Sequence, residues 1–175
     1  MTTAMHRGEY TITTDRDRFD LAAIHRFLTR SYWSPGVPIA IVERSIANSL
    51  CFGLFHQRDQ VGLARVITDK ATFAYLSDVY VLESHRGKGL SKWLLAVIRS
   101  HEDLQGLRRF MLSTQDAHGL YSQFGFTALA FPSRMMEVLN ADPYRPPPAP
   151  APAPAPMSAP MSAPTPTPAE RPPDG

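Results

Sequence analysis

The chain has 175 residues, 43% of them hydrophobic, which is enough for one domain with a real core. Its net charge is only +2, so its composition does not indicate a nucleic-acid-binding protein. The N-terminus lacks the apolar stretch of a signal peptide, and no segment approaches transmembrane length. The single cysteine, Cys51, cannot form an internal disulfide and lies in an apolar run, which predicts a core residue. We therefore expect a cytoplasmic protein with no membrane partner.

The first part of the chain predicts one strand followed by two helices. Residues 9–14 are rich in β-branched side chains and predict a short strand. Residues 19–30 predict a helix with one apolar face, preceded by aspartates that can cap it. Pro38 can open a second helix. The predicted buried stripe of that helix consists of Ile39, Val42, Ile46 and Leu50.

The middle of the chain predicts three strands and the most regular helix. Two apolar runs, 51–56 and 61–68, are separated by a polar turn and predict a hairpin. The long run 71–81 predicts a third strand. A helix is predicted from Leu90 to about Leu104, because apolar residues recur there at helical spacing.

The last part of the folded region predicts three strands and a short helix. The strands are expected at 109–113, 127–131 and 135–139, and the helix at 117–123. The complete order is β-α-α-β-β-β-α-β-α-β-β. A strand–helix–strand crossover requires one parallel pair, so we expect an α/β (α+β) fold with a mixed, mostly antiparallel central sheet flanked by helices.

Composition changes abruptly near Tyr144. Most of the 17 prolines follow it and alternate with alanine, a pattern that supports neither helix nor sheet. We predict a folded domain over 1–143 and a disordered, extended Pro/Ala-rich tail over 144–175.

The turn between the third run and the regular helix carries the strongest functional signal. Its sequence, Arg-Gly-Lys-Gly-Leu-Ser over 86–91, puts two glycines and two basic residues at the start of a helix. Free backbone N–H groups and the positive end of the helix dipole favour an anion there. The pattern is neither a Walker loop nor a full dinucleotide fingerprint, and a plain surface turn is a competing interpretation of this turn alone.

Two motifs together resemble the GNAT acyltransferase superfamily. The first is the 86–91 turn, which resembles the signature Arg/Gln-x-x-Gly-x-Gly/Ala, although Ser91 stands at its last small position. The second is Leu-Tyr-x-x-x-Gly-Phe, present without change at 120–126. The resemblance extends over roughly residues 9–139 and includes the order of elements.

The resemblance implies acetyl-CoA, or a related acyl-CoA, as the donor substrate. Its pyrophosphate would bind the backbone N–H groups at the helix start, and its pantetheine arm would pair with a bulged strand that separates from its neighbour. The N–H of Val79 would polarise the thioester carbonyl. The implied donor-binding residues are Val79, Tyr80, Val81, Arg86, Gly87, Lys88, Gly89, Leu90 and Ser91.

The resemblance also suggests catalytic residues. Tyr121 matches the position of a tyrosine near the CoA sulfur, where it would act as general acid, and its structural alternative is an aromatic residue that packs the short helix. Asp78 precedes the donor-pairing segment and is a candidate general base. An equally weighted alternative makes Asp78 a hydrogen-bond acceptor for a turn or an arginine, and a water chain could replace a single base.

Acceptor recognition is expected in the loop between the first two helices. Tyr32 and Trp33 could line a pocket or stack on a cation there, and capping of the core edge is as strong an alternative. No cysteine pair or His-Glu-x-x-His motif is present, so we expect no metal site.

The sequence thus predicts an N-acetyltransferase that transfers acetyl from acetyl-CoA to the amine of a small molecule, amino acid or peptide. A non-catalytic acyl-CoA-binding sensor or interaction module is the alternative, and O-acylation is a further possibility. Family edge strands often pair between subunits, so a homodimer is also predicted.

Overall fold

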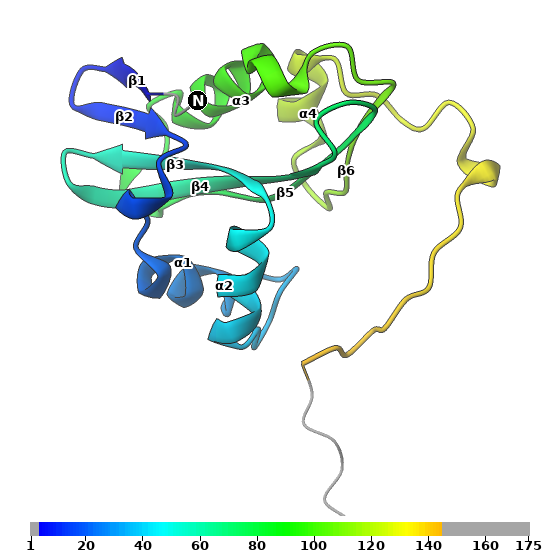
Figure 1. The fold of residues 1–175 in the computed structure, drawn as a ribbon, viewed down its shortest axis with the longest axis horizontal. Helices are drawn as coiled ribbons and strands as arrows, with labels where there is room; N and C mark the ends of the chain where they lie inside the picture. Colours follow the sequence, from blue (N-terminus) through cyan, green and yellow to red (C-terminus); the bar gives the residue numbers. More distant parts are fainter. Residues whose placement is uncertain (1–3, 145–175) are drawn as a thin grey trace, which may run out of the picture. The chain divides into compact units, whose positions relative to one another are not determined.

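In the computed structural model, which describes residues 4–144, six strands form one sheet in the order β1-β2-β3-β4-β5-β6 (Figure 1). All neighbouring strands are antiparallel except β5 and β6, which are parallel. The strands are β1 (Ala4–Arg7), β2 (Tyr10–Thr13), β3 (Leu50–His56), β4 (Asp59–Thr68), β5 (Phe73–Val81) and β6 (Arg109–Leu112). This confirms the mixed, mostly antiparallel sheet predicted from the sequence.

Helices cover both faces of the sheet (Figure 1). On one face lie α1 (Leu21–Leu28) and α2 (Ile39–Ala47), and on the other lie α3 (Leu90–Ser100) and the single-turn α4 (His118–Tyr121). The side chain of Asp20 caps α1 by accepting a hydrogen bond from the N–H of Ala23 at 2.9 Å. Short 3-10 turns occupy Arg16–Arg18, Glu83–His85, Glu102–Leu104, Ser122–Phe124 and Pro132–Arg134.

The core is divided into two layers by the sheet. The α3 face holds the larger cluster, in which Phe52, Leu54 and Leu94 are fully buried. The α1–α2 face holds a second cluster, which includes Ile24 and Leu63. Each such side chain contributes about 1.5–3 kcal/mol through burial. Cys51 is buried in the second cluster, as predicted, and burial raises the pKa of its thiol to about 12.

The two ends of the domain differ from the predicted order of elements. At the N-terminus, β1 forms a hairpin with β2 through Gly8, whose φ is +58°. All four residues of β1 are exposed, so the strand lacks the alternating pattern that would have revealed it. Near the other end, the strands predicted at 127–131 and 135–139 do not form, and that prediction was wrong for this chain.

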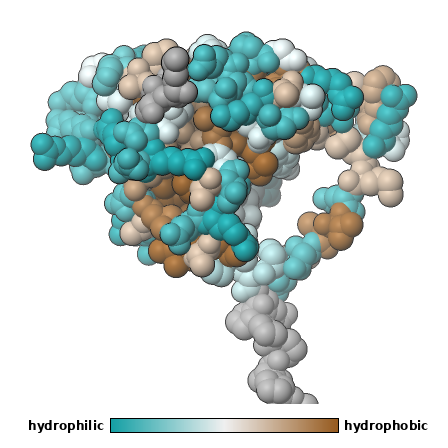
Figure 2. All heavy atoms as spheres, in the orientation of Figure 1, coloured by the Kyte–Doolittle hydropathy of each residue, from teal (hydrophilic) through white to brown (hydrophobic). Residues whose placement is uncertain are grey.

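The physical reason is that a strand requires a hydrogen-bonded neighbour and a buried face, and this segment has neither. Residues 125–135 lie beside β6 across a groove without a strand ladder, and Pro132 begins a 3-10 turn. The exposed fractions of Met136 and Leu139 are 96% and 72%. Figure 2 shows hydrophobic (brown) spheres among hydrophilic (teal) ones along the arc at the right of the view.

The predicted Pro/Ala-rich tail lies outside the described residues from 145 onward, so its disorder and the domain boundary at 143 remain predictions. Within residues 4–144, no helix has both the length and the apolarity needed to cross a membrane.

Candidate active site

The central feature of the site is an opening between β5 and β6. The parallel ladder between these strands ends at the pair Leu76 and Leu112, so the rest of β5, from Ser77 to Val81, has no β6 partner. A cleft of about 870 Å³ occupies this opening. Its walls come from β5, the start of α3, the α1–α2 loop, and the segment from Ser113 to Tyr121.

A bulge in β5 shapes the floor of the cleft. Leu63 pairs with Tyr80 and Arg65 pairs with Ser77, so Asp78 and Val79 together lie opposite Ala64. The φ of Asp78 is +51°, a conformation that L side chains rarely adopt.

The bulge also reverses the alternation of side chains along β5. Ala74 and Leu76 pack toward α3, whereas Tyr80, which a regular strand would place on their face, packs against α1 and α2. The bulge and the strand separation expected from the family resemblance are therefore both present.

The 86–91 turn has the geometry of an anion site. Gly87 and Gly89 have φ of +77° and +70°, which glycine adopts without a Cβ penalty. Gly89 is the N-cap of α3 and offers no side-chain hydrogen bond. The first intrahelical bond runs from Trp93 N to Gly89 O, so the N–H groups of the residues in between have no helical acceptor.

The predicted donor-binding side chains do not all lie on the same side of this turn. Arg86 and Ser91 line the cleft, and the Nε of Arg86 donates to the carbonyl of Val81 at 3.1 Å. Leu90 is buried in the core and leaves only its backbone for a ligand. Val79, Tyr80 and Val81 also line the cleft.

Lys88 points instead toward β2. Its Nζ donates to the hydroxyl of Tyr10 at 3.0 Å, and the same hydroxyl is 3.0 Å from Nδ1 of His85. Burial, followed by the charge of Lys88, lowers the pKa of His85. Tyr10 thus ties the turn to the N-terminal hairpin, a contact that the sequence did not reveal because 75 or more residues separate its partners.

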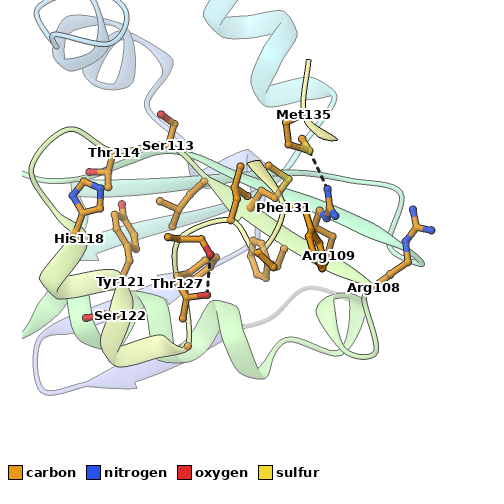
Figure 3. Close-up of a pocket in the computed structure, with 18 residues that line it drawn as sticks. Arg108, Arg109, Ser113, Thr114, His118, Tyr121, Ser122, Thr127, Phe131 and Met135 are labelled. Carbon is orange, nitrogen blue, oxygen red and sulfur yellow. Dashed lines mark hydrogen bonds between the residues drawn. The ribbon is translucent and has the colours of Figure 1, made fainter. Parts of the chain in front are cut away.

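Tyr121 projects from α4 toward the loop that carries Thr114 (Figure 3). It lines the cleft and also the neighbouring groove along β6. Burial raises the pKa of its hydroxyl to about 12, with smaller contributions from Tyr32 and Asp116. A neutral hydroxyl at this position can donate a proton.

The carboxylate of Asp78 is buried in the cleft and fully engaged. Its Oδ2 accepts from Nε of Arg65 at 2.6 Å, and its Oδ1 accepts from Nε1 of Trp33 at 3.2 Å. Arg65 also donates to the hydroxyls of Ser49 and Ser77, at 3.2 Å each. We did not predict Arg65 as part of the site. A lone arginine within the apolar run 61–68 was the available signal, because a buried guanidinium requires a carboxylate partner.

Aromatic side chains form the wall opposite the turn. Tyr32 and Trp33 lie in the α1–α2 loop, and both line the cleft. Phe27 of α1, which we did not predict, stacks on Tyr80 with ring centroids 3.8 Å apart and is 6.2 Å from Trp33. The hydroxyl of Tyr32 accepts a hydrogen bond from the N–H of Gln115 at 3.3 Å, so the loop reaches across to the segment after β6.

Within residues 4–144, no group of three or more His, Cys, Asp or Glu side chains is arranged to hold a metal ion. The groups that line the cleft include the backbone of β5, the hydroxyl of Tyr121 and the paired carboxylate of Asp78.

Comparison with known proteins identifies the class. A family model described as an acetyltransferase (GNAT) domain matches residues 47–128, which include the bulge, the turn and Tyr121. A candidate acetyltransferase from Gibberella zeae is 35% identical over 140 residues, which cover 67% of this chain and 78% of that protein. Fold and cleft thus define an acetyltransferase.

Solved structures agree with this class. A GNAT-family candidate acetyltransferase from Xanthomonas campestris pv. campestris is 48% identical, covers 79% of this chain and 99% of its own, and superimposes with a TM-score of 0.77. A candidate acetyltransferase from Deinococcus radiodurans R1, at 16% identity and a TM-score of 0.63, covers 84% of this chain and 100% of its own and shares the fold. The chain belongs to the GNAT acetyltransferase family, whose general reaction is acetyl transfer from acetyl-CoA.

Proposed function

We propose that this protein N-acetylates the primary amine of a small molecule or peptide, with acetyl-CoA as donor. One observation carries the proposal: a single cleft is lined by the β5 bulge, by Arg86 and Ser91 of the anion-binding turn, and by Tyr121. These are the groups that polarise a thioester, hold a diphosphate and protonate a thiolate.

The donor fits the residues around the turn. The free N–H groups at the start of α3 and the guanidinium of Arg86 would hold the diphosphate. The unpaired edge of β5 from Val79 to Val81 would hydrogen-bond the amide-like arm, as an added strand does. The competing interpretation of the turn is a plain surface turn without a ligand. Such a turn would not require the adjacent strand β5 to separate from β6.

The chemical step follows from the same groups. The neutral amine attacks the thioester carbonyl carbon, a C–N bond forms, and the N–H of Val79 stabilises the oxyanion. The C–S bond then breaks and Tyr121 gives its proton to the departing thiolate, while the proton released by the attacking nitrogen passes through water and restores the Tyr121 hydroxyl. The base role predicted for Asp78 stays a prediction. Its contacts with Arg65 and Trp33 favour the alternative in which it accepts hydrogen bonds from an arginine, and through Trp33 it would also anchor the acceptor wall.

Replacement of Tyr121 by Phe tests the proposal. The general-acid role predicts a fall in kcat of roughly 100-fold or more, while the acetyl-CoA Kd measured by calorimetry changes little. Product mass and fragmentation distinguish N- from O-acetylation. Tight acetyl-CoA binding without turnover of any amine by the wild-type protein would favour the sensor alternative instead.

We also propose a homodimer that uses the open side of β6. Among the described strands, β6 pairs with β5 alone, and its open side faces a groove whose other wall is the first part of the exposed apolar segment 127–139. Pairing of this segment with a second copy would give the open edge of β6 hydrogen-bond partners and would bury the apolar side chains of the segment.

Sedimentation at increasing concentration tests the dimer. We expect a dimer mass for the wild type and a monomer mass for the double variant M136K/V138K, with acetyl-CoA binding retained in both. A wild-type protein that stays monomeric throughout contradicts the proposal. A cytoplasmic location is proposed as well, because the one cysteine is a buried free thiol.

A further inference from the structure

We propose that the acceptor is a primary amine with a flat or apolar body and no carboxylate next to the amine, as in an arylalkylamine. This inference rests on the proposed function and concerns the far end of the same cleft. It distinguishes between three classes of acceptor that the sequence analysis did not distinguish, namely simple amines, amino acids and peptides.

The acceptor wall is built from three aromatic rings. Tyr32 and Trp33 meet edge to face with centroids 4.9 Å apart, and Trp33 is 6.2 Å from Phe27. All three rings line the cleft. Such a wall favours an apolar or aromatic ligand body, and its ring faces also attract a cationic amine before that amine loses its proton.

Hydrogen bonds tether both aromatic tips of the wall. The indole N–H of Trp33 donates to Asp78, which is fixed in turn by Arg65. The hydroxyl of Tyr32 is bound by the N–H of Gln115 on the opposite side. With both aromatic tips tethered, we expect the wall to favour a compact ligand over a long peptide, which would meet the Tyr32 contact between the two sides of the cleft.

The charged residues that line the cleft are Asp78, Asp116 and Arg86. Arg86 belongs to the donor-binding turn, where it also pairs with Glu83 at 3.3 Å. The guanidinium of Arg65 is occupied by Asp78.

Among the described residues, no basic side chain other than Arg86 lines the cleft, so an α-carboxylate bound at the acceptor end would have no basic partner on its walls. Asp116, Tyr32 and Tyr121 line the same cleft. A carboxylate next to the acceptor nitrogen would face the charge of Asp116 without a basic partner. An amine without that carboxylate avoids the repulsion, and its ammonium form is attracted.

Matched pairs of acceptors test the inference directly. Tyramine is compared with tyrosine, and phenethylamine with phenylalanine, by measuring the rate of acetylated product formation by mass spectrometry. We expect kcat/KM for the decarboxylated member of each pair to exceed that of the amino acid by on the order of 100-fold. Butylamine serves as an amine without an aromatic body. Its kcat/KM should lie between the values for the arylalkylamines and those for the amino acids.

Two variants assign the effect to the wall and to the charge. In Asp116→Asn the ratio of kcat/KM for tyramine to kcat/KM for tyrosine should fall several-fold. In Trp33→Leu the KM for phenethylamine should rise relative to that for butylamine, while the acetyl-CoA Kd is unchanged. A global loss of folding would instead change the KM values for both amines and the acetyl-CoA Kd together.

The outcomes separate this inference from the proposed function. Equal or faster acetylation of the amino acids, or a preference for peptide amines over all small amines, overturns the acceptor class and leaves the N-acetyltransferase intact. Acetyl-CoA binding with no amine acetylated overturns both.

Discussion

The two ends of the cleft are constructed differently. The end proposed to bind the donor consists largely of backbone: glycines in left-handed conformations, an uncapped helix start and an unpaired strand edge. The end proposed to bind the acceptor consists of side chains from α1, the following loop, β4, β5 and the segment after β6. The family model covers 47–128 and so includes the first end but not Tyr32 or Trp33. A backbone site can be shared across a family while side chains of the other end vary with the acceptor.

The largest effect that distinguishes the two ends is expected at Asp78. Asp78→Asn removes the ion pair of a guanidinium whose side chain is only 13% exposed, and breaking such a buried pair costs about 3–5 kcal/mol. We expect a lower Tm and a higher KM for the acceptor, because the anchor of Trp33 is weakened. The shape of the pH profile of kcat/KM should stay the same.

The control for this variant is the double replacement R65M/D78N, which removes both buried charges. It should recover part of the lost stability, because no unpaired charge remains. If Asp78→Asn instead abolishes turnover and removes the ascending limb of the pH profile at wild-type Tm, Asp78 is the general base and the anchoring role is contradicted.

The next effect concerns the donor end and can be measured against a matched glycine. Gly89 and Gly106 have φ of +70° and +68°, and an added Cβ has no neighbour closer than 3.9 Å at either position. Alanine at each position should therefore destabilise the fold equally, by about 1–2 kcal/mol. Only Gly89→Ala should weaken acetyl-CoA binding, roughly tenfold, because only that turn would hold the diphosphate.

Thermal unfolding and calorimetry of the two alanine variants provide the measurement. Equal losses of acetyl-CoA affinity in both variants would show that the effect comes from stability alone. The turn would then have no special role in donor binding.

The smallest effect is expected in the alkaline range. The raised pKa of Tyr121, about 12, keeps its hydroxyl protonated as the pH increases, so the acid function is lost only as the pH approaches that value. The acceptor amine, with a pKa near 10, becomes deprotonated first. Stopped assays should show kcat/KM rising up to about pH 10 without an alkaline decline. A decline centred between pH 8 and 9 would contradict the proton-donor role.

Prediction from sequence worked best where the pattern is local. The helical spacing from Leu90 onward, the hairpin between β3 and β4, and the glycine turn all depend on residues that are neighbours in the chain. The strands expected at 127–131 and 135–139 failed for the complementary reason. Their composition suits a strand, but strand formation also depends on a partner edge that composition does not specify.

The sequence by itself determined the family, the order of most elements and the turn that begins α3, because glycine conformations and helix starts are set within a few residues. Only the tertiary structure decided the acceptor end. Arg65 meets Asp78 across two strands, and Tyr32 reaches Gln115 from 83 residues away. Contacts between residues so distant in the chain form through packing of the whole sheet and its helices, which no local pattern encodes.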